Sequence, residues 1–272
     1  MSLIEKVEEY WDNRPCNFHH SNKDISSLEF FDEVMKKKFF VEPHIIPFCD
    51  FEKYNGKKVL DLGCGLGTMA VNYAKHGAQV TCVDLSLASL KLCQKNFELR
   101  GLKGKFIHAN AEQLSELDEL ERTFDLVFSF GVIHHSPSPQ TIIDQIKLLL
   151  KPRGELKLMV YNRYSYKLFQ VLNELETWNF KNVDTQFAKR SEAQPNCPVT
   201  HTFTTDSLEL LLGQGFSSVS IHKDHIFKYD IEKYVNQEFV IDAAFRGMTN
   251  EEFREMEKEL GLHLLVCAIA SE

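Results

Sequence analysis

Three glycines at alternate positions form the feature of this sequence with the clearest chemistry. They occur in the segment VLDLGCGLGT, which runs from Val59 to Thr68 and contains Gly63, Gly65 and Gly67. The segment reads as the end of a strand and the start of a helix. Glycines at such a turn let the backbone bend sharply and let a ligand approach it, close to the N–H groups of the helix N-terminus. We expect a nucleotide-type ligand here.

The residues that flank the glycines indicate which ligand it is. A dinucleotide fingerprint needs Gly or Ala at the position of Thr68, and it does not require an acid two residues before the first glycine, where this chain has Asp61. A carboxylate there would repel a pyrophosphate, whereas it would attract an ammonium group through a charge-assisted hydrogen bond. The pattern therefore predicts a cofactor with an amino group and disfavours a nicotinamide oxidoreductase.

Asp84 supplies a second acid at the end of the next expected strand, about where nucleotide-binding α/β folds use a carboxylate to bind ribose hydroxyls. Each feature alone also has a structural explanation. A glycine turn can be a tight connection, and an Asp after a strand can be a helix cap. Together they favour a binding site.

With these motifs, the stretch from Val59 to Tyr161 resembles the class I S-adenosylmethionine (SAM)-dependent methyltransferases. The resemblance implies SAM as cofactor and S-adenosylhomocysteine as product. It places the methionine part at Asp61 and the glycine turn, the ribose at Asp84, and the adenine at Leu85. The cofactor contacts that it implies are Asp61, Gly63, Cys64, Gly65, Gly67, Asp84, Leu85, Asn110, Ala111, Phe130 and Gly131.

Two further segments bear on this resemblance. Asn110, in HANAEQL, stands where the family often has an adenine-contacting Asp, and an amide oxygen can accept the same hydrogen bond without a charge. The run FDLVFSFGVIHHSPSP looks like the fourth strand and its loop, which places His135 near the transferred methyl group. Its GVIHHSP part resembles methyltransferases that act on small molecules and quinone-type acceptors.

Candidate catalytic groups follow from the chemistry of methyl transfer. The reaction is an in-line displacement with an activated leaving group, so alignment and exclusion of water supply most of the acceleration. A histidine near a hydroxyl or amine acceptor can take its proton near neutral pH. His135 is the first candidate and His134 the alternate, although either could instead pack under the loop. Tyr161 and His201 are further candidates, and His201 fits a bracing role slightly better.

Other residues were weighed for ligand contacts. Tyr161, Asn162, Arg163 and Tyr164 follow strand five, where open α/β sheets bind ligands, and they are candidate acceptor contacts. For Arg163 the sequence favours a solvated position on the lid over a pair with an anionic acceptor. The polar, aromatic N-terminal arm could fold over the cofactor or lie on the surface, and the sequence does not separate these alternatives. His222 and His225 resemble a metal pair, but strand periodicity would place them on opposite faces, so no metal site is predicted.

Composition limits the class of protein and of partner. The formal net charge of -8 and the pI near 5.8 disfavour nucleic-acid binding, so a small-molecule acceptor is the expected partner. The seven cysteines are scattered and form no C-x-x-C pair, which indicates neither disulfides nor zinc and fits a cytoplasmic location. No signal peptide and no membrane span is expected. The oligomeric state is not indicated.

The elements that must position these residues alternate between short apolar runs and helices from Lys58 onward. This pattern predicts an α/β fold, namely a Rossmann-like, doubly wound, mostly parallel seven-stranded sheet with helices on both faces. The expected strands are Val59–Leu62, Gln79–Val83, Lys105–His108, Phe124–Phe130, Glu155–Val160, Ser217–Phe227 and Leu262–Ala270. We expect a single domain over 1–272, with a helical cap (1–54), a SAM-binding core (55–160), a lid insertion (161–204) and C-terminal helices and strands (205–272).

The function predicted from the sequence is methyl transfer from SAM to oxygen, nitrogen or carbon of a small molecule. A tRNA or protein methyltransferase is one alternative, and it would require a basic face or a recognition domain. A non-catalytic SAM-binding regulator is another, and it would keep the glycine turn but lack a closed acceptor pocket.

Overall fold

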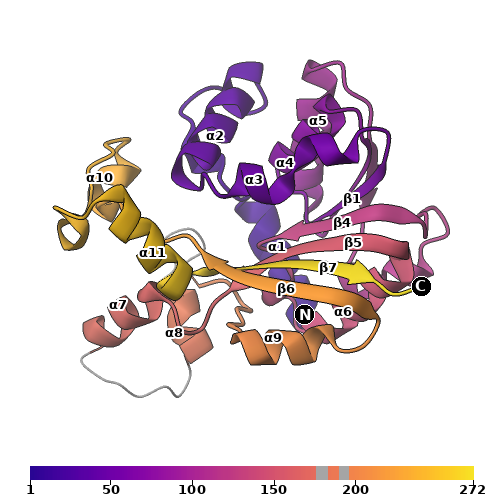
Figure 1. Ribbon diagram of the computed structural model, residues 1–272. Coiled ribbons are helices and arrows are strands. Elements are labelled where there is room, and N and C mark those ends of the chain that lie inside the picture. Colours follow the sequence, from indigo (N-terminus) through magenta and orange to yellow (C-terminus); the bar gives the residue numbers. More distant parts are fainter. Residues whose placement is uncertain (176–182, 190–195) are drawn as a thin grey trace.

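A seven-stranded sheet forms the centre of the molecule in the computed structural model, which describes residues 1–175, 183–189 and 196–272 (Figure 1). The strand order is β3-β2-β1-β4-β5-β7-β6. The strands are β1 (Lys58–Leu62), β2 (Gln79–Asp84), β3 (Lys105–His108), β4 (Phe124–Phe130), β5 (Leu150–Tyr161), β6 (Phe216–Asp224) and β7 (His263–Ala270). Strands β1 to β5 pair in parallel, and only β7 runs antiparallel to its neighbours. The mostly parallel seven-stranded sheet predicted from the sequence is confirmed.

Helices cover both faces of this sheet (Figure 1). Helices α4 (Thr68–Lys75) and α5 (Leu87–Leu99) lie on one face, and α6 (Pro139–Leu149) and α9 (Thr205–Leu212) lie on the other. The central strands β1 and β4 are buried over most of their length, because helices cover both faces of the sheet. This layering confirms the doubly wound arrangement. It also sets the carboxyl ends of β1, β2 and β4 along one edge, where the glycine turn emerges.

Local signals in the sequence placed most helix starts correctly. Ser2 and Glu5 form the expected capping box before α1 (Leu3–Asn13), and Ser86 caps α5. A second capping box, of Thr249 and Glu252, begins α11 (Asn250–Leu260). A third capping box, of Thr204 and Ser207, begins α9 (Thr205–Leu212).

Two strand boundaries also differ from expectation. Strand β5 begins at Leu150, earlier than the expected Glu155. Strand β6 ends at Asp224 and not at Phe227, because His225 has a left-handed backbone conformation with a φ of 68°. A non-glycine residue in that conformation cannot continue a strand. The chain therefore leaves the sheet at His225, and the segment that follows packs elsewhere.

The N-terminal region packs across the carboxyl edge of the sheet as three helices: α1, α2 (Leu28–Val41) and the short α3 (Ile45–Cys49). Helix α3 was not predicted. Asp12, near the end of α1, accepts hydrogen bonds from the Ser86 hydroxyl (2.7 Å) and the Ala88 N–H (3.0 Å) at the start of α5. These bonds fix the N-terminal arm beside the end of β2.

The remaining helices follow β5 and β6. Helices α7 (Tyr166–Glu174) and α8 (Val183–Lys189) belong to the expected lid, of which residues 176–182 and 190–195 lie outside the described part. After β6 come α10 (Ile231–Val235) and α11. Short 3-10 turns are Phe18–His20, Phe51–Tyr54, Ala111–Glu116, Ile133–His135 and Ala243–Phe245. No helix in the described ranges is both long and apolar enough to cross a bilayer.

Candidate cofactor and acceptor site

A cavity of about 880 Å³ opens at the carboxyl edge of the sheet. Its walls come from the glycine turn, the ends of β2 and β4, the N-terminal arm, and the segment after β6. This volume is within the range of small-molecule and cofactor sites, up to about 1,000 Å³. The position is also where open α/β sheets bind ligands.

The three glycines of the turn have different roles, although all have positive φ angles (76°, 52° and 77°). A Cβ atom on Gly63 would lie 2.3 Å from a methyl group of Val132. A Cβ atom on Gly65 would meet no protein atom within 4 Å, and Gly65 lines the cavity. Gly67 does not line the cavity, and its Cβ would lie 2.5 Å from the Cys93 sulfur. Gly65 therefore gives a ligand access to the backbone, whereas Gly67 serves packing.

Asp61 is a buried carboxyl group that faces the cavity. The residue is 3% exposed, and its Oδ2 atom has no hydrogen-bond partner among the residues that the structure describes. Burial, with the nearby Asp84 carboxylate, raises the pKa of Asp61 to about 7. An unpaired carboxylate oxygen in a buried position is costly unless a ligand supplies a donor. The site thus fits a ligand that carries a cationic amine.

Asp84 both caps local backbone and lines the cavity. Its two carboxylate oxygens accept hydrogen bonds from the Gly65 N–H and the Ser86 N–H, each at 2.8 Å. Burial raises the pKa of Asp84 to about 6. Each oxygen keeps a second lone pair toward the cavity, so the capping role and the predicted ribose contact are compatible.

The other predicted cofactor residues gather at the same cavity. Its lining includes Cys64, Leu85, Asn110, Ala111, Phe130 and Gly131. The Asn110 side-chain oxygen accepts a hydrogen bond from the Glu112 N–H (3.0 Å), so it caps the following 3-10 turn. In the predicted adenine contact, the same oxygen would then have to accept two hydrogen bonds, one from the Glu112 N–H and one from the adenine amino group.

His135 and Tyr161 line the cavity, whereas His134 does not. His135 is buried, and its Nδ1 lies 2.9 Å from the carbonyl oxygen of Val199. Because a carbonyl only accepts, Nδ1 carries the proton and Nε2 is the basic nitrogen of the ring. The ring also packs edge-on against Trp11 of α1, with centroids 5.3 Å apart.

His134 and His201 lie behind this loop. His134 is fully buried against Tyr161, with ring centroids 4.0 Å apart, and burial holds its pKa well below the usual value. His201 approaches the Ser136 carbonyl through Nε2 (3.1 Å), and its backbone N–H donates to the His134 carbonyl (2.8 Å). Neither histidine lines the cavity, so these two predicted catalytic groups are placed as supports of the His135 loop.

The expected acceptor contacts after strand five point elsewhere. Asn162 donates to the carbonyl oxygen of Gly261 (2.8 Å), and Arg163 pairs with Asp184 (3.4 Å). Beyond Tyr161, none of the described lid residues lines the cavity. The Asn162 and Arg163 side chains thus fix the start of the lid to the rest of the fold. The far end of the cavity is lined by the end of α2 and by residues between 225 and 237.

Sequence reasoning missed four residues that come together at this far end: Glu42, His44, His225 and His263. They come from the end of α2, the start of α3, the residue after β6 and the first residue of β7. Their spacing carried no signal, since no two of the three histidines belong to the same element. The sequence did not decide whether the N-terminal arm covers the site. In the structure Ile4, Val7 and Trp11 of α1 line the cavity.

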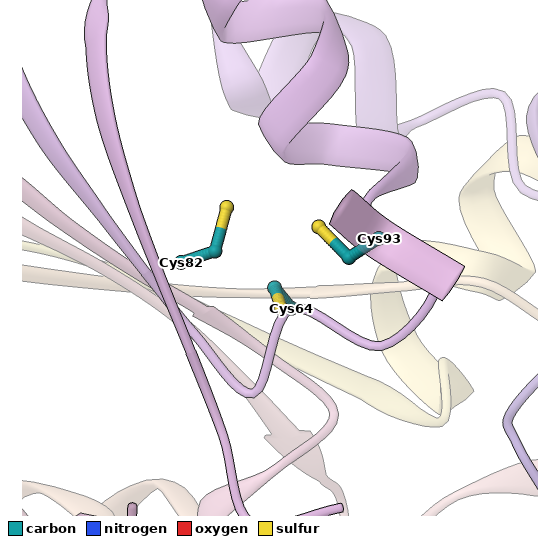
Figure 2. A group of neighbouring side chains, drawn as sticks. All are labelled: Cys64, Cys82 and Cys93. Atoms are coloured by element: carbon teal, nitrogen blue, oxygen red, sulfur yellow. The ribbon is translucent and has the colours of Figure 1, made fainter. Parts of the chain in front are cut away.

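A second cluster that spacing did not reveal consists of Cys64, Cys82 and Cys93, whose sulfur atoms lie within 4.8 Å of one another (Figure 2). The side chains come from the glycine turn, β2 and α5, and they belong to a buried apolar cluster. Burial raises the pKa of the Cys82 and Cys93 thiols well above the usual value. Neutral thiols in apolar surroundings pack as small hydrophobic groups. We therefore assign this cluster to the core beneath the turn.

Comparison with known families matches the same part of the chain. The sequence model of a family described as "Methyltransferase domain" matches residues 59–154, which include the glycine turn, Asp84 and His135. Strands β1 to β4 and the cofactor side of the cavity fall within this range.

Residues 59–154 therefore match a methyltransferase domain.

Several curated relatives share the same name. The "Ubiquinone biosynthesis O-methyltransferase" of Maricaulis maris is 36% identical over 112 residues, covering 41% of this chain and 43% of that protein. The protein of the same name from Pseudomonas fluorescens is 34% identical over 154 residues, covering 53% and 66%. This chain spans about half the length of the curated relatives it matches.

Solved structures share the fold over nearly the whole chain. The magnesium protoporphyrin IX methyltransferase from Synechocystis PCC 6803, solved with bound SAM, aligns with a TM-score of 0.57 and 14% identity, covering 100% of this chain and 98% of that one. A putative methyltransferase in complex with the Haloferax volcanii Trm112 methyltransferase activator aligns with a TM-score of 0.60 and 14% identity, covering 98% of each chain. At such identities the likeness establishes the fold of the methyltransferase domain.

Proposed function

We propose that this protein is a SAM-dependent methyltransferase that methylates an oxygen of a small organic acceptor. One observation carries the proposal: the unpartnered, buried oxygen of Asp61 faces a cavity beside Gly65, whose backbone is open to a ligand. An amine fits the carboxylate, and a nucleoside fits the edge formed by Asp84 and Leu85. The name of the curated relatives supports oxygen as the acceptor atom and a small molecule as the acceptor.

The residues of the cavity have separate tasks in this proposal. Asp61 and the glycine turn bind the amino-acid part of the cofactor, and Asp84 binds its ribose. The cofactor, when bound, supplies an activated methyl group. His135, whose Nδ1 lies 2.9 Å from the Val199 carbonyl oxygen, accepts the proton of the acceptor hydroxyl at Nε2. Trp11 of the N-terminal arm packs on His135 and helps to exclude water.

We propose that residues 1–272 form a single domain with the four segments predicted from the sequence: cap, core, lid and C-terminal part. Support comes from the cavity, which is lined by residues of the cap (1–54), the core (55–160) and the C-terminal part (205–272). Tyr161 is the contribution of the lid to the lining. A cytoplasmic location is proposed from the cysteine content alone.

Calorimetric titration of the full chain with SAM, S-adenosylhomocysteine and NAD in parallel tests the cofactor. We expect both adenosyl compounds to bind and NAD not to bind. Binding of NAD alone would overturn the proposal. For the reaction, SAM with an isotope-labelled methyl group is incubated with a set of small phenols and matched anilines, and the products are analysed by mass spectrometry. Label in the anilines but not in the phenols would contradict oxygen as the acceptor atom.

A further inference from the structure

The far end of the cavity holds a buried group of metal-ligating side chains that the proposed methyl transfer does not use. Glu42, His225 and His263 line the cavity, and His44 lies directly behind them. The three histidines are buried, and the Glu42 side chain is 13% exposed. Three imidazoles and a carboxylate in one buried place are expensive to desolvate, so they call for an explanation.

The distance between two of the histidines fits coordination of one ion. His44 Nε2 lies 3.0 Å from His263 Nδ1. Nitrogen ligands that bind one metal at about 2.1 Å are about 3.0 Å apart at a right angle and about 3.4 Å apart in a tetrahedron. The same two nitrogens share a hydrogen bond, so an ion would take the place of its proton without a large movement of either ring.

Glu42 supplies the third ligand atom. One carboxylate oxygen of Glu42, one nitrogen of His44 and one nitrogen of His263 all lie within 4.8 Å of one another. Glu42 Oε1 pairs with the Lys38 ammonium at 2.5 Å, whereas Oε2 is buried and has no hydrogen-bond partner in the described part of the chain. A buried carboxylate oxygen without a donor is the atom that a cation would satisfy.

The Asp224 carboxylate lies behind His44, farther away than a hydrogen bond. The Asp224 carboxylate lies 4.0 Å from His44 Nδ1, on the side of the ring opposite to Nε2. Arg254 fixes Asp224 through two hydrogen bonds of 3.0 Å. A carboxylate behind the outer nitrogen of a histidine is a recurrent feature of metal sites, where it sets the tautomer and the direction of the ring.

His225 completes the group at the expense of backbone strain. Its φ of 68° is costly for a residue with a side chain. This conformation ends β6 and places the imidazole against its neighbours, with centroid distances of 5.2 Å to His44 and 4.7 Å to His263. Strain of this kind persists where surrounding contacts impose it, and it concentrates at functional sites.

We propose that Glu42, His44 and His263 bind a divalent transition-metal ion, with His225 beside the ion as a fourth potential ligand. Two imidazoles and one carboxylate select zinc, iron, cobalt or nickel over magnesium or calcium, which prefer all-oxygen sites. Three protein ligands leave at least one position open toward the cavity. If the proposed function holds, that position receives an oxygen of the acceptor, so the ion orients the acceptor and polarises its hydroxyl.

The protonation of the cluster agrees with this geometry. Burial lowers the pKa values of His44 and His263 below their usual range, so both rings are neutral near pH 7. Neutral imidazole is the form that binds metals. The cysteine cluster differs, since it has neutral thiols and no carboxylate or imidazole among its three side chains (Figure 2). It therefore provides a control within the same chain.

The experiment uses Co²⁺, whose visible absorption reports the ligands, followed by Zn²⁺ competition monitored by calorimetry. The full chain is first treated with a chelator and dialysed. We expect wild-type protein to bind Co²⁺ with ligand-field bands and without a thiolate charge-transfer band. The Glu42→Gln and His263→Asn variants should lose at least about ten-fold in affinity. The controls are His222→Ala, an exposed histidine of β6, and Cys93→Ala, which should both bind like wild type.

Lys38→Met provides a test in the opposite direction. Removal of the ammonium frees Glu42 Oε1 from its ion pair, so affinity for Co²⁺ should rise several-fold. Absence of Co²⁺ and Zn²⁺ binding by wild type, or undiminished binding by Glu42→Gln, would overturn the metal site. Loss of binding in Cys93→Ala alone would move the ion to the cysteine cluster and have the same effect. If His263→Asn does not fold by circular dichroism, Glu42→Gln decides.

SAM titration of the same samples separates this proposal from the proposed function. Metal binding without SAM binding leaves the metal site and rejects the methyltransferase. SAM binding without metal binding leaves the methyltransferase and rejects the metal site.

Discussion

The two ends of the cavity differ in how the chain builds them. The cofactor end consists mainly of one stretch, Val59–Thr68, together with Asp84 and the residues that follow β3 and β4. The acceptor end joins the end of α2 with His225 to Gln237 and the start of β7, far apart in sequence. The first end depends on a local turn and is shared with a family. The second depends on how distant elements meet, so it can vary without disturbing the cofactor.

The largest expected effect concerns Asp61 at the cofactor end. Asp61→Ala removes the buried carboxylate that fits the cofactor amine, and SAM affinity should fall by roughly 100-fold, as for a lost charge-assisted hydrogen bond of about 3 kcal/mol. Calorimetry measures this. Asp118→Ala, at an exposed acid, is the control and should bind like wild type. If Asp61→Ala bound SAM with nearly wild-type affinity, the carboxylate would not hold the cofactor at this end of the cavity.

The pH dependence of SAM affinity should identify the same carboxyl group. The pKa of Asp61 is raised to about 7, so the group loses its charge as pH falls through 7. The cofactor amine binds the charged form, and SAM affinity should therefore rise roughly ten-fold from about pH 5.5 to pH 7 and fall once the amine deprotonates near pH 8. Calorimetry over this range measures it. In Asp61→Asn the acidic limb should be absent, and its persistence would assign the titration to another group.

Two glycines with similar backbones allow a matched comparison. Gly65 and Gly101 both have positive φ (52° and 63°), and an added Cβ would meet no protein atom within 4 Å at either. Each Gly→Ala change should cost similar stability, about 1 kcal/mol. Only Gly65→Ala places a methyl group in the cavity, so it alone should weaken SAM binding, by roughly ten-fold. Equal SAM affinities of the two variants would show that the ligand does not approach Gly65.

The N-terminal arm should have a smaller effect on the cofactor. Asp12→Ala removes two hydrogen bonds to the start of α5, at a cost of about 1 kcal/mol, as for a lost helix cap. The arm then loosens, and SAM affinity should fall about three-fold. Thermal unfolding and calorimetry measure the two effects. Glu9→Ala, on the same helix, serves as control. If Asp12→Ala lost as much SAM affinity as Asp61→Ala, the arm would have to be counted as part of the cofactor end.

The smallest expected effect on SAM comes from the acceptor end. Lys37 donates to the Gln237 side chain (2.9 Å) and lies 4.5 Å from the ring centroid of Tyr234, which ties α2 to the segment after β6. Lys37→Met should lower stability by about 1 kcal/mol. SAM affinity should change less than about two-fold, because this contact is remote from the glycine turn. The exposed neighbour variant, Lys36→Met, should change neither quantity, and a large loss of SAM affinity in Lys37→Met would couple the two ends.

Much of the fold followed from local signals. The apolar runs predicted all seven strands, and the capping residues Ser2, Ser86 and Thr249 marked helix starts, because both depend on residues close in sequence. The packing role of Gly67 was not visible in the sequence, since only the tertiary structure shows that Cys93 fills the space beside it. His134 was a catalytic candidate by adjacency, yet consecutive residues of a 3-10 turn face different directions, and only His135 reaches the cavity.

The sequence by itself determined the cofactor end, because the turn, Asp61 and Asp84 are tied to consecutive strands of a parallel sheet whose carboxyl ends must share one edge. The tertiary structure alone decided the acceptor end. Glu42, His44, His225 and His263 carry no common spacing, and they meet only because α2 and α3 pack over the edge while a left-handed residue turns the chain out of β6. Contacts between residues so far apart depend on packing of whole elements, which no local pattern encodes.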